Sequence, residues 1–306
     1  MTAAEMQAEA EKDRFVYHQL FTPTFHHDVY PSIDPGSSEL KQDGRIVLIT
    51  GASGPIGAEH ARSFAKAGAR AIIITARRIE VLEALKKEIE DTYRDTEVVC
   101  IQCDLTSEAD VERLWNNVVS RFGTVSVVVS CAASRSQMKR IGDTDISGWW
   151  GDFETNVKAL YLLTRHAANL KSDSPVTFIN MTSSMAVETV PTRSNYAITK
   201  SAGCRLIEYV HAEHPNIRAF NLHPGIVPNG VQFGMLAGAN IDTAALSAGV
   251  SLYLCTPRAD FLRGRFISAN WTVGDLEARK EEIVAQNLLT TYLRAKLGPG
   301  GHFAQK

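Results

Sequence analysis

The 306-residue chain has no hydrophobic run that approaches the roughly 18 consecutive apolar residues a membrane-spanning helix needs. It also has little net charge: 32 basic and 34 acidic side chains leave −2, so no nucleic-acid or polyanion partner is indicated. The N-terminus, Met1-Thr-Ala-Ala-Glu-Met6, lacks the basic start and apolar stretch of a signal peptide. These absences predict a soluble, cytoplasmic protein with neither a membrane nor a nucleic-acid partner.

Cysteine is scarce, and the five present form no disulfide framework. Cys100 and Cys103 lie three residues apart in an expected strand, where such side chains face opposite sides of a sheet, which excludes a metal or redox pair. The adjacent His26 and His27 have no partners at ligand spacing, and we interpret them as ordinary surface residues. No metal site is therefore expected. Internal repeats and low-complexity segments are also lacking.

Short apolar runs alternate with helical stretches along most of the chain. This alternation predicts an α/β fold with a parallel sheet of about seven strands covered by helices on both faces. We divide the chain into an N-terminal extension (1–43), a catalytic domain (44–272) and a C-terminal helical extension and tail (273–306). The expected strands are 45–50, 71–75, 98–102, 125–130, 176–181, 217–222 and 264–269, and the expected helices include 79–94, 107–122, 149–171, 195–213 and 242–255.

The first expected strand leads directly into a glycine-rich turn, Gly51-Ala-Ser-Gly-Pro-Ile-Gly57, and then into a helical stretch. Strand, glycine turn and helix form the arrangement that presents backbone N–H groups and a helix N-terminus to a pyrophosphate. Pro55 suits the first position of that helix, where the N–H has no partner in any case. The N–H groups of Ile56 and Gly57 remain available to phosphate. The pattern predicts a dinucleotide site.

Tyr196 and Lys200 are four residues apart in an expected helix, so both side chains lie on one face. An ammonium group beside a phenol favours the phenolate and suits the tyrosine to proton transfer. Ser183 stands thirteen residues before the tyrosine, at the end of an expected strand. The spacing recurs at Tyr292 and Lys296, but without a serine thirteen residues earlier, which indicates an ordinary surface helix there.

Together these segments resemble the classical short-chain dehydrogenase/reductase family over about residues 44–272. The lead-in and the segment Gly264–Trp271 resemble those of uncharacterised fungal members. The matching segments are Thr50–Gly57, Asp104 in Cys103-Asp-Leu105, Ser130-Cys-Ala-Ala133, Asn156 in Thr155-Asn-Val-Lys158, Ser183, Tyr196, Lys200 and Pro224-Gly225. There are two departures: Pro55 replaces a glycine, and Ser130–Ala133 keeps only the alanine of an Asn-Asn-Ala-Gly motif.

The resemblance implies a Rossmann-like doubly wound fold and a set of residue roles. Tyr196 would donate a proton to a carbonyl oxygen that Ser183 orients, with Ser184 as the alternative serine. Lys200 would also hold the nicotinamide ribose, and Asn156 would anchor a water that links Lys200 to solvent. The expected cofactor contacts are Gly51, Ser53, Ile56, Gly57, Arg77, Arg78, Asp104, Leu105, Ala132, Asn156, Tyr196, Lys200, Pro224, Gly225 and Val227.

The end of the second expected strand indicates which nicotinamide cofactor is used. NAD sites place an acidic side chain there to accept from the ribose hydroxyls, whereas NADP sites accommodate a phosphate with arginine. Here Ala76 takes the place of the acid, and Arg77 follows in position to contact a 2′-phosphate. Arg78 either assists or is a solvated charge. We expect NADP(H).

The segment after Pro224-Gly225 contains four glycines and several apolar side chains, which is typical of a mobile lid over a substrate pocket. Packing of these residues against the core or a neighbouring subunit is the competing interpretation. Arg135 is the one basic candidate for a polar end of the substrate. Expected substrate contacts are Val231, Phe233 and Met235 on the lid, Met185 and Val187 on the opposite wall, and Arg135.

These features predict an NADPH-dependent enzyme that reversibly reduces a ketone on a fairly large, mostly apolar molecule, for example in secondary metabolism. Two alternatives stay open: a redox-neutral cyclase, dehydratase or epimerase on the same fold, and a non-catalytic NADP(H) sensor. Tyr161, Leu162 and Tyr209 offer apolar surface for an isologous contact, so we expect a homodimer or homotetramer.

Overall fold

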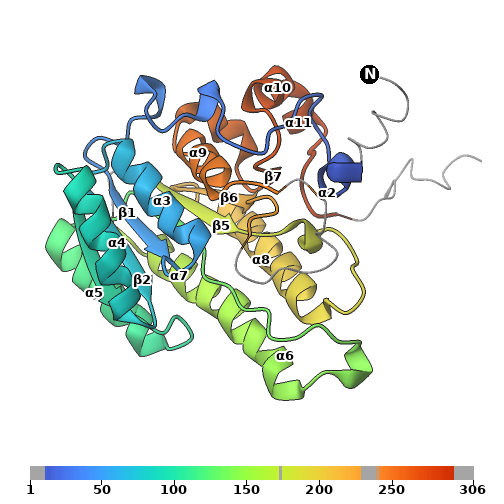
Figure 1. Ribbon diagram of the computed structural model, residues 1–306, viewed down its shortest axis with the longest axis horizontal. Coiled ribbons are helices and arrows are strands. Elements are labelled where there is room, and N and C mark those ends of the chain that lie inside the picture. Colours follow the sequence, from blue (N-terminus) through green and yellow to red (C-terminus); the bar gives the residue numbers. More distant parts are fainter. Residues whose placement is uncertain (1–10, 172–173, 229–238, 240, 293–306) are drawn as a thin grey trace, which may run out of the picture.

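A computed structural model describes residues 11–171, 174–228, 239 and 241–292, and these contain a seven-stranded parallel sheet (Figure 1). The strand order is β3-β2-β1-β4-β5-β6-β7, so the winding reverses between β1 and β4. Ligands bind at such a reversal, outside the carboxyl ends of the strands. The strands are β1 (Ile46–Thr50), β2 (Ala71–Ala76), β3 (Glu97–Gln102), β4 (Val127–Ser130), β5 (Val176–Met181), β6 (Ile217–His223) and β7 (Phe266–Ser268). The predicted doubly wound fold is confirmed, and strand bounds differ from the expected ones by at most two residues.

Helices cover both faces of the sheet. One face carries α3 (Pro55–Lys66), α4 (Ile79–Thr92) and α9 (Ala244–Leu254), and the other carries α5 (Glu108–Phe122), α7 (Ala159–Ala168) and α8 (Ser194–Glu213). The shorter helices are α2 (Arg14–Tyr17), α6 (Ile146–Phe153), α10 (Val273–Ala278) and α11 (Lys280–Ala285). Short 3-10 helices are η1 (Pro31–Ile33), η2 (Ser38–Leu40), η3 (Ile141–Asp143), η5 (Ser184–Ala186) and η7 (Pro257–Leu262). The segment η4 (Glu154–Lys158) is a π-helical turn.

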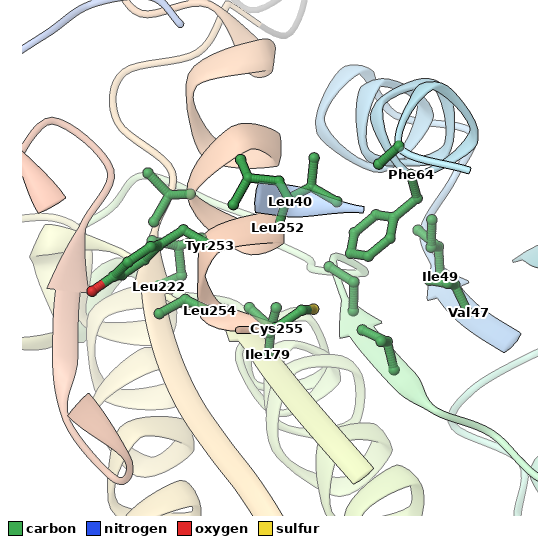
Figure 2. Close-up of a cluster of buried hydrophobic side chains, with 14 of the residues drawn as sticks. Leu40, Val47, Ile49, Phe64, Ile179, Leu222, Leu252, Tyr253, Leu254 and Cys255 are labelled. Atoms are coloured by element: carbon green, nitrogen blue, oxygen red, sulfur yellow. The ribbon is translucent and has the colours of Figure 1, made fainter. Parts of the chain in front are cut away.

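Alternating side chains of each strand supply two separate cores. Val47 and Ile49 of β1 pack toward Phe64 of α3, whereas Ile46 and Leu48 point to the opposite face. Figure 2 shows the first of these cores, where side chains of β1, α3 and α9 meet. Cysteines follow the same alternation: Cys100 packs against one core and Cys103 lies in the other, and all five cysteines are free. The two side chains therefore face opposite sides of the sheet, as their spacing predicts.

The expected helix 149–171 lies three residues earlier in the chain, at 146–168, and is less regular than its pattern indicates. It begins as α6 and passes through the π-helical turn η4 into α7. The prediction that Leu162 offers surface for a subunit contact is wrong, because α7 turns this side chain into the core beneath α5. Tyr161 and Tyr209 are about half exposed, as expected.

Residues 11–43 pack closely on α9 and the end of β7, as the blue trace beside α9 and α10 in Figure 1 shows. Ile33 is fully buried. A Cβ added at Gly249 of α9 would lie 2.4 Å from the carbonyl oxygen of Ile33, so only glycine leaves room for this contact. The indole of Trp271 donates to the carbonyl oxygen of Gln19. The description of His26 and His27 as ordinary surface residues is wrong. His26 stacks on Tyr30, with ring centroids 3.7 Å apart, and His27 is held between two aspartates.

Within the described ranges, none of the helices is both long enough and apolar enough to span a membrane. The same ranges contain no cluster of three His, Cys, Asp or Glu side chains that could hold a metal ion.

Candidate active site

The glycine turn after β1 is packed too tightly for larger residues. Gly51 has φ +68°, and a Cβ there would lie 2.7 Å from the backbone nitrogen of Ala132. A Cβ on Gly57 would lie 2.6 Å from the carbonyl oxygen of Gly51. As predicted, Pro55 is the first residue of α3, with Gly54 as its N-cap. The turn brings the N-terminus of a 12-residue helix to the edge of the sheet, where its free N–H groups can hold a pyrophosphate.

A cleft of about 710 Å³ runs along the carboxyl ends of β1 to β4. It joins the glycine turn at one end to Tyr196 at the other. Of the predicted site residues it is lined by Gly51, Ser53, Ile56, Gly57, Arg77, Asp104, Leu105, Ala132, Arg135 and Tyr196. The predicted residues that do not line it are Arg78, Asn156, Ser183, Lys200, Met185, Val187, Pro224, Gly225 and Val227. Val231, Phe233 and Met235 lie outside the described residues.

The β2 end of the cleft has the chemistry expected for the adenosine half of a dinucleotide. Ala76 is the last residue of β2, and both it and the exposed Arg77 line the cleft. The buried Thr75 lines it as well. Asp104 accepts from the backbone N–H and the hydroxyl of Thr106, which fixes the turn after β3. A glycine turn that leaves no room for a Cβ and a helix N-terminus together fit a dinucleotide.

Tyr196 and Lys200 occupy one face of α8, as their spacing predicts. Lys200 is only 5% exposed, and its Nζ donates to the carbonyl oxygen of Met181 at 2.7 Å. That Nζ lies 5.6 Å from the centre of the Tyr196 ring. The ring itself is half-buried and lines the cleft, so the lysine lies behind a tyrosine that a ligand can reach.

Ser183 directly follows Thr182 at the end of β5 and begins the turn η5. Its Oγ accepts from the backbone N–H of Met185 at 3.3 Å, and the residue is half-buried. The alternative serine, Ser184, is 7% exposed. Exposure therefore favours Ser183 as the serine within reach of a ligand.

Asn156 lies in the π-helical turn η4, an irregularity that is frequent at functional sites. Its Oδ1 accepts from Ser134 N at 2.7 Å, and its Nδ2 donates to Ser134 O and to Thr199 Oγ1 at 2.8 and 3.0 Å. The side-chain amide therefore links the loop after β4 to α8.

Asp152 is a site residue that the sequence analysis missed. Its side chain is fully buried and accepts from the hydroxyls of Ser134 and Ser136, the N–H of Ser136 and the amide of Asn195. It thus ties the loop after β4 to the residue that precedes Tyr196. The signal in the sequence was its position four residues before Asn156, on the same face of an apolar helix.

A second arginine, Arg193, lies near Arg135 on the tyrosine side of the cleft. Arg135 lines the cleft, and Arg193, three residues before Tyr196, is only 4% exposed. Burial lowers the pKa of Arg193, and the nearby positive charge of Arg135 lowers it further. The residue before it, Thr192, has φ +68°, a strained conformation for a β-branched side chain.

Comparison of the sequence with known proteins identifies the family to which the chain belongs. The profile of the short chain dehydrogenase family matches residues 45–233, and the chain belongs to that family. It is 32% identical over 279 residues to the short chain dehydrogenase mpl6 of Monascus purpureus, covering 88% of this chain and 94% of that one.

Among solved structures, a short chain dehydrogenase from Shigella flexneri, complexed with NADP, aligns with a TM-score of 0.70 at 22% identity. The alignment covers 76% of this chain and 99% of that one. A 7α-hydroxysteroid dehydrogenase, complexed with NADH and 7-oxo glycochenodeoxycholic acid, aligns with a TM-score of 0.70 at 23% identity, covering 78% and 96%. These likenesses establish the fold. Membership of the family makes the chain an oxidoreductase that uses a nicotinamide cofactor on small molecules.

Proposed function

We propose that the protein is an NADPH-dependent reductase that reversibly converts a ketone on a fairly large, mostly apolar molecule into an alcohol. The observation that carries this proposal is the cleft that joins the glycine turn to Tyr196, with Lys200 buried behind the ring. One end therefore suits a dinucleotide, and the other presents a group suited to proton transfer.

The cofactor would be held by the groups that line the cleft. Backbone N–H groups at the start of α3, including that of Ile56, face its pyrophosphate, and Arg77 meets a 2′-phosphate where Ala76 leaves no carboxylate to repel it. The bound nicotinamide supplies the hydride for carbonyl reduction. Lys200 has three N–H donors and directs one to Met181 O, which leaves others for the nicotinamide ribose.

Three side chains would act on the ketone oxygen and its proton. Tyr196 gives the proton, and the nearby ammonium of Lys200 favours the phenolate that remains. Ser183 Oγ accepts from Met185 N–H, so its own proton is free to point at the ketone oxygen and stabilise charge developing there.

The surroundings of the tyrosine support an apolar substrate with one polar end. Val187, on the segment between Ser183 and Tyr196, is more than half exposed. On the facing helix α6, the stacked rings of Trp149 and Phe153 lie beside α8, where the indole of Trp149 donates to Ser194 Oγ. Arg135 is positioned to contact the polar end. The 7α-hydroxysteroid dehydrogenase of similar fold binds 7-oxo glycochenodeoxycholic acid, and by analogy this supports a substrate of that size here.

Cofactor preference can be tested by fluorescence titration with NADPH and NADH. We expect NADPH to bind more tightly, and Arg77→Ala to weaken NADPH binding by about tenfold while leaving NADH binding near the parent value. Arg78→Ala is the matched control, because this neighbour is exposed but does not line the cleft. Tighter binding of NADH, or an unchanged NADPH affinity in Arg77→Ala, would overturn the NADP assignment.

The substrate class can be tested with a panel of ketones while NADPH absorbance is followed. Bicyclic and aromatic ketones should give higher kcat/KM than polar ketoses or short keto acids. The opposite order would refute the apolar-substrate proposal. No oxidation of bound NADPH with any member of the panel would favour a redox-neutral enzyme or a sensor.

For assembly we propose a homodimer or homotetramer through the exposed faces of α7 and α8, which carry Tyr161 and Tyr209. Light scattering across micromolar concentrations should give a multiple of the 33.6 kDa chain mass. A constant monomer mass would contradict it. We further propose that the protein acts in the cytoplasm and that residues 44–272 form its catalytic domain.

A further inference from the structure

We propose that His27 of the N-terminal segment positions the loop that follows β6, and thereby sets the affinity for the nicotinamide cofactor. His27 acts through Asp242, whose carboxylate holds that loop in place. The inference rests on the proposed function and on the cofactor contacts that the family resemblance implies for Pro224, Gly225 and Val227, which lie beside the cleft lining and not in it.

Both ring nitrogens of His27 meet aspartate oxygens. Nδ1 lies 2.6 Å from Asp242 Oδ1, and Nε2 lies 2.9 Å from Asp13 Oδ1. Both hydrogen bonds form only when two protons are shared among the ring and the two carboxylates, and such charge-assisted bonds are stronger than neutral ones. The three side chains, here named the His27 clamp, join positions up to 229 residues apart in the sequence.

Asp242 carries the constraint from the clamp to the loop. Its side chain is fully buried, and its Oδ2 accepts the backbone N–H of Ile226. A second hydrogen bond joins the same two residues, because the backbone N–H of Asp242 donates to the carbonyl oxygen of Ile226 at 3.0 Å. Asn270 Nδ2 donates to Asp242 Oδ1, the oxygen that also contacts His27, at 2.8 Å. Burial raises the pKa of Asp242, and the hydrogen bonds from Ile226 and His27 oppose that rise.

Gly225 shows how closely the loop lies on this carboxylate. It has φ +86°, and a Cβ there would lie 2.4 Å from Asp242 Oδ2. A shift of the carboxylate therefore moves the loop backbone directly, because no flexible side chain lies between them.

The loop lies at the edge of the sheet where the catalytic groups are. It follows β6, which pairs with β5, and Thr182 N donates to Leu222 O at 2.8 Å, one residue before Ser183. Parallel sheets bind ligands at this edge. In the proposed enzyme the loop would contact the nicotinamide end of the cofactor.

The adjacent histidine provides a matched control. His26 belongs to the same segment, stacks on Tyr30 and lies 3.1 Å from Thr272 Oγ1, but its side chain makes no contact with Asp242 in the described structure. General loosening of the segment would affect His26→Ala and His27→Ala alike. Loss of the clamp affects only the second variant. Asp13→Asn preserves an acceptor for Nε2, whereas Asp13→Ala removes it.

The test combines hydrogen–deuterium exchange at the Ile226 amide with fluorescence titration of NADPH. His27→Ala should speed exchange at Ile226 and raise the NADPH dissociation constant by about tenfold, the loss expected for one charge-assisted hydrogen bond. At saturating NADPH its kcat should stay within about twofold of the parent value. Asp13→Ala should share the defect, Asp13→Asn should show a smaller one because its hydrogen bond is neutral, and His26→Ala should lack it.

Each result decides a different point. Unchanged exchange at Ile226 in both His27→Ala and Asp13→Ala would overturn the positioning role. Faster exchange with unchanged NADPH affinity would show that the loop is held but does not serve the cofactor, which also overturns the inference. If the parent protein binds no nicotinamide cofactor, the proposed function fails, and the cofactor role of the clamp fails with it. The exchange measurement then still shows whether His27 holds the loop.

Discussion

Replacing Asp152 by alanine should destabilise the folded protein by about 3–5 kcal/mol, because four buried donors lose the acceptor that they share. This carboxylate is the junction between α6, the loop after β4 and the start of α8. Its loss should also lower turnover, because Asn195, one of its partners, directly precedes the proposed proton donor.

The magnitude follows from the groups left without an acceptor. Ser134 Oγ and Ser136 Oγ donate to the carboxylate at 2.6 and 3.1 Å, Ser136 N lies 3.0 Å away, and Asn195 Nδ2 makes the fourth contact. A hydrogen bond to a charged group contributes about 1.5–3 kcal/mol, and a buried donor left unpaired costs about 1–3 kcal/mol. These contributions share one acceptor and are not additive, so the sum falls well below four separate bonds.

Urea denaturation at neutral pH measures this change through the midpoint at constant m-value. Asp152→Asn is the control, because it keeps the shape and one acceptor oxygen and should cost about half as much. A cost below about 1 kcal/mol for Asp152→Ala would refute the reasoning, because it would mean that water or new partners satisfy all four donors.

Two further predictions concern the glycine turn and acid stability. Gly51→Ala should abolish tight NADPH binding, since its Cβ would lie 2.7 Å from Ala132 N, whereas Gly44→Ala, with a similar φ of +76° and nothing within 4 Å, should lose only about 1 kcal/mol of stability and keep NADPH affinity. Equal NADPH affinities of the two variants would contradict this. Burial lowers the pKa of both His60 and His223 from 6.5 to about 4, so the unfolded chain binds more protons between these values. The contribution of the two neutral histidines to the free energy of unfolding should therefore be complete above about pH 6.5. It should fall as the pH drops toward 4, by up to about 2.7 kcal/mol per pH unit for the two groups together. A free energy of unfolding that does not fall between pH 6.5 and 4.5 would rule out buried neutral histidines.

The sequence predicted those parts of the molecule that depend on local pattern. The central strands β1, β2 and β4 are largely apolar and almost entirely buried runs. The Tyr196–Lys200 spacing fixes a shared helix face whatever surrounds it. Pro55 was placed correctly for the same reason, since its fixed φ and missing N–H suit one position of a helix.

What the sequence did not reveal depends on partners far along the chain. His27 gains its role from Asp242, 215 residues away, and no local pattern marks that contact. Asp152 is buried only because two serines and an asparagine from other elements satisfy it. Leu162 was assigned to the surface because the helical pattern alone does not show which neighbours cover which face.

Turnover by Tyr196→Phe tests the central claim most directly. The account predicts NADPH affinity close to the parent value and a fall in kcat of about 10²–10⁴-fold with a ketone substrate, because only the proton donor is removed. Tyr161→Phe, an exposed tyrosine on α7, should behave like the parent. Parent-level turnover by Tyr196→Phe with NADPH binding intact would contradict the account.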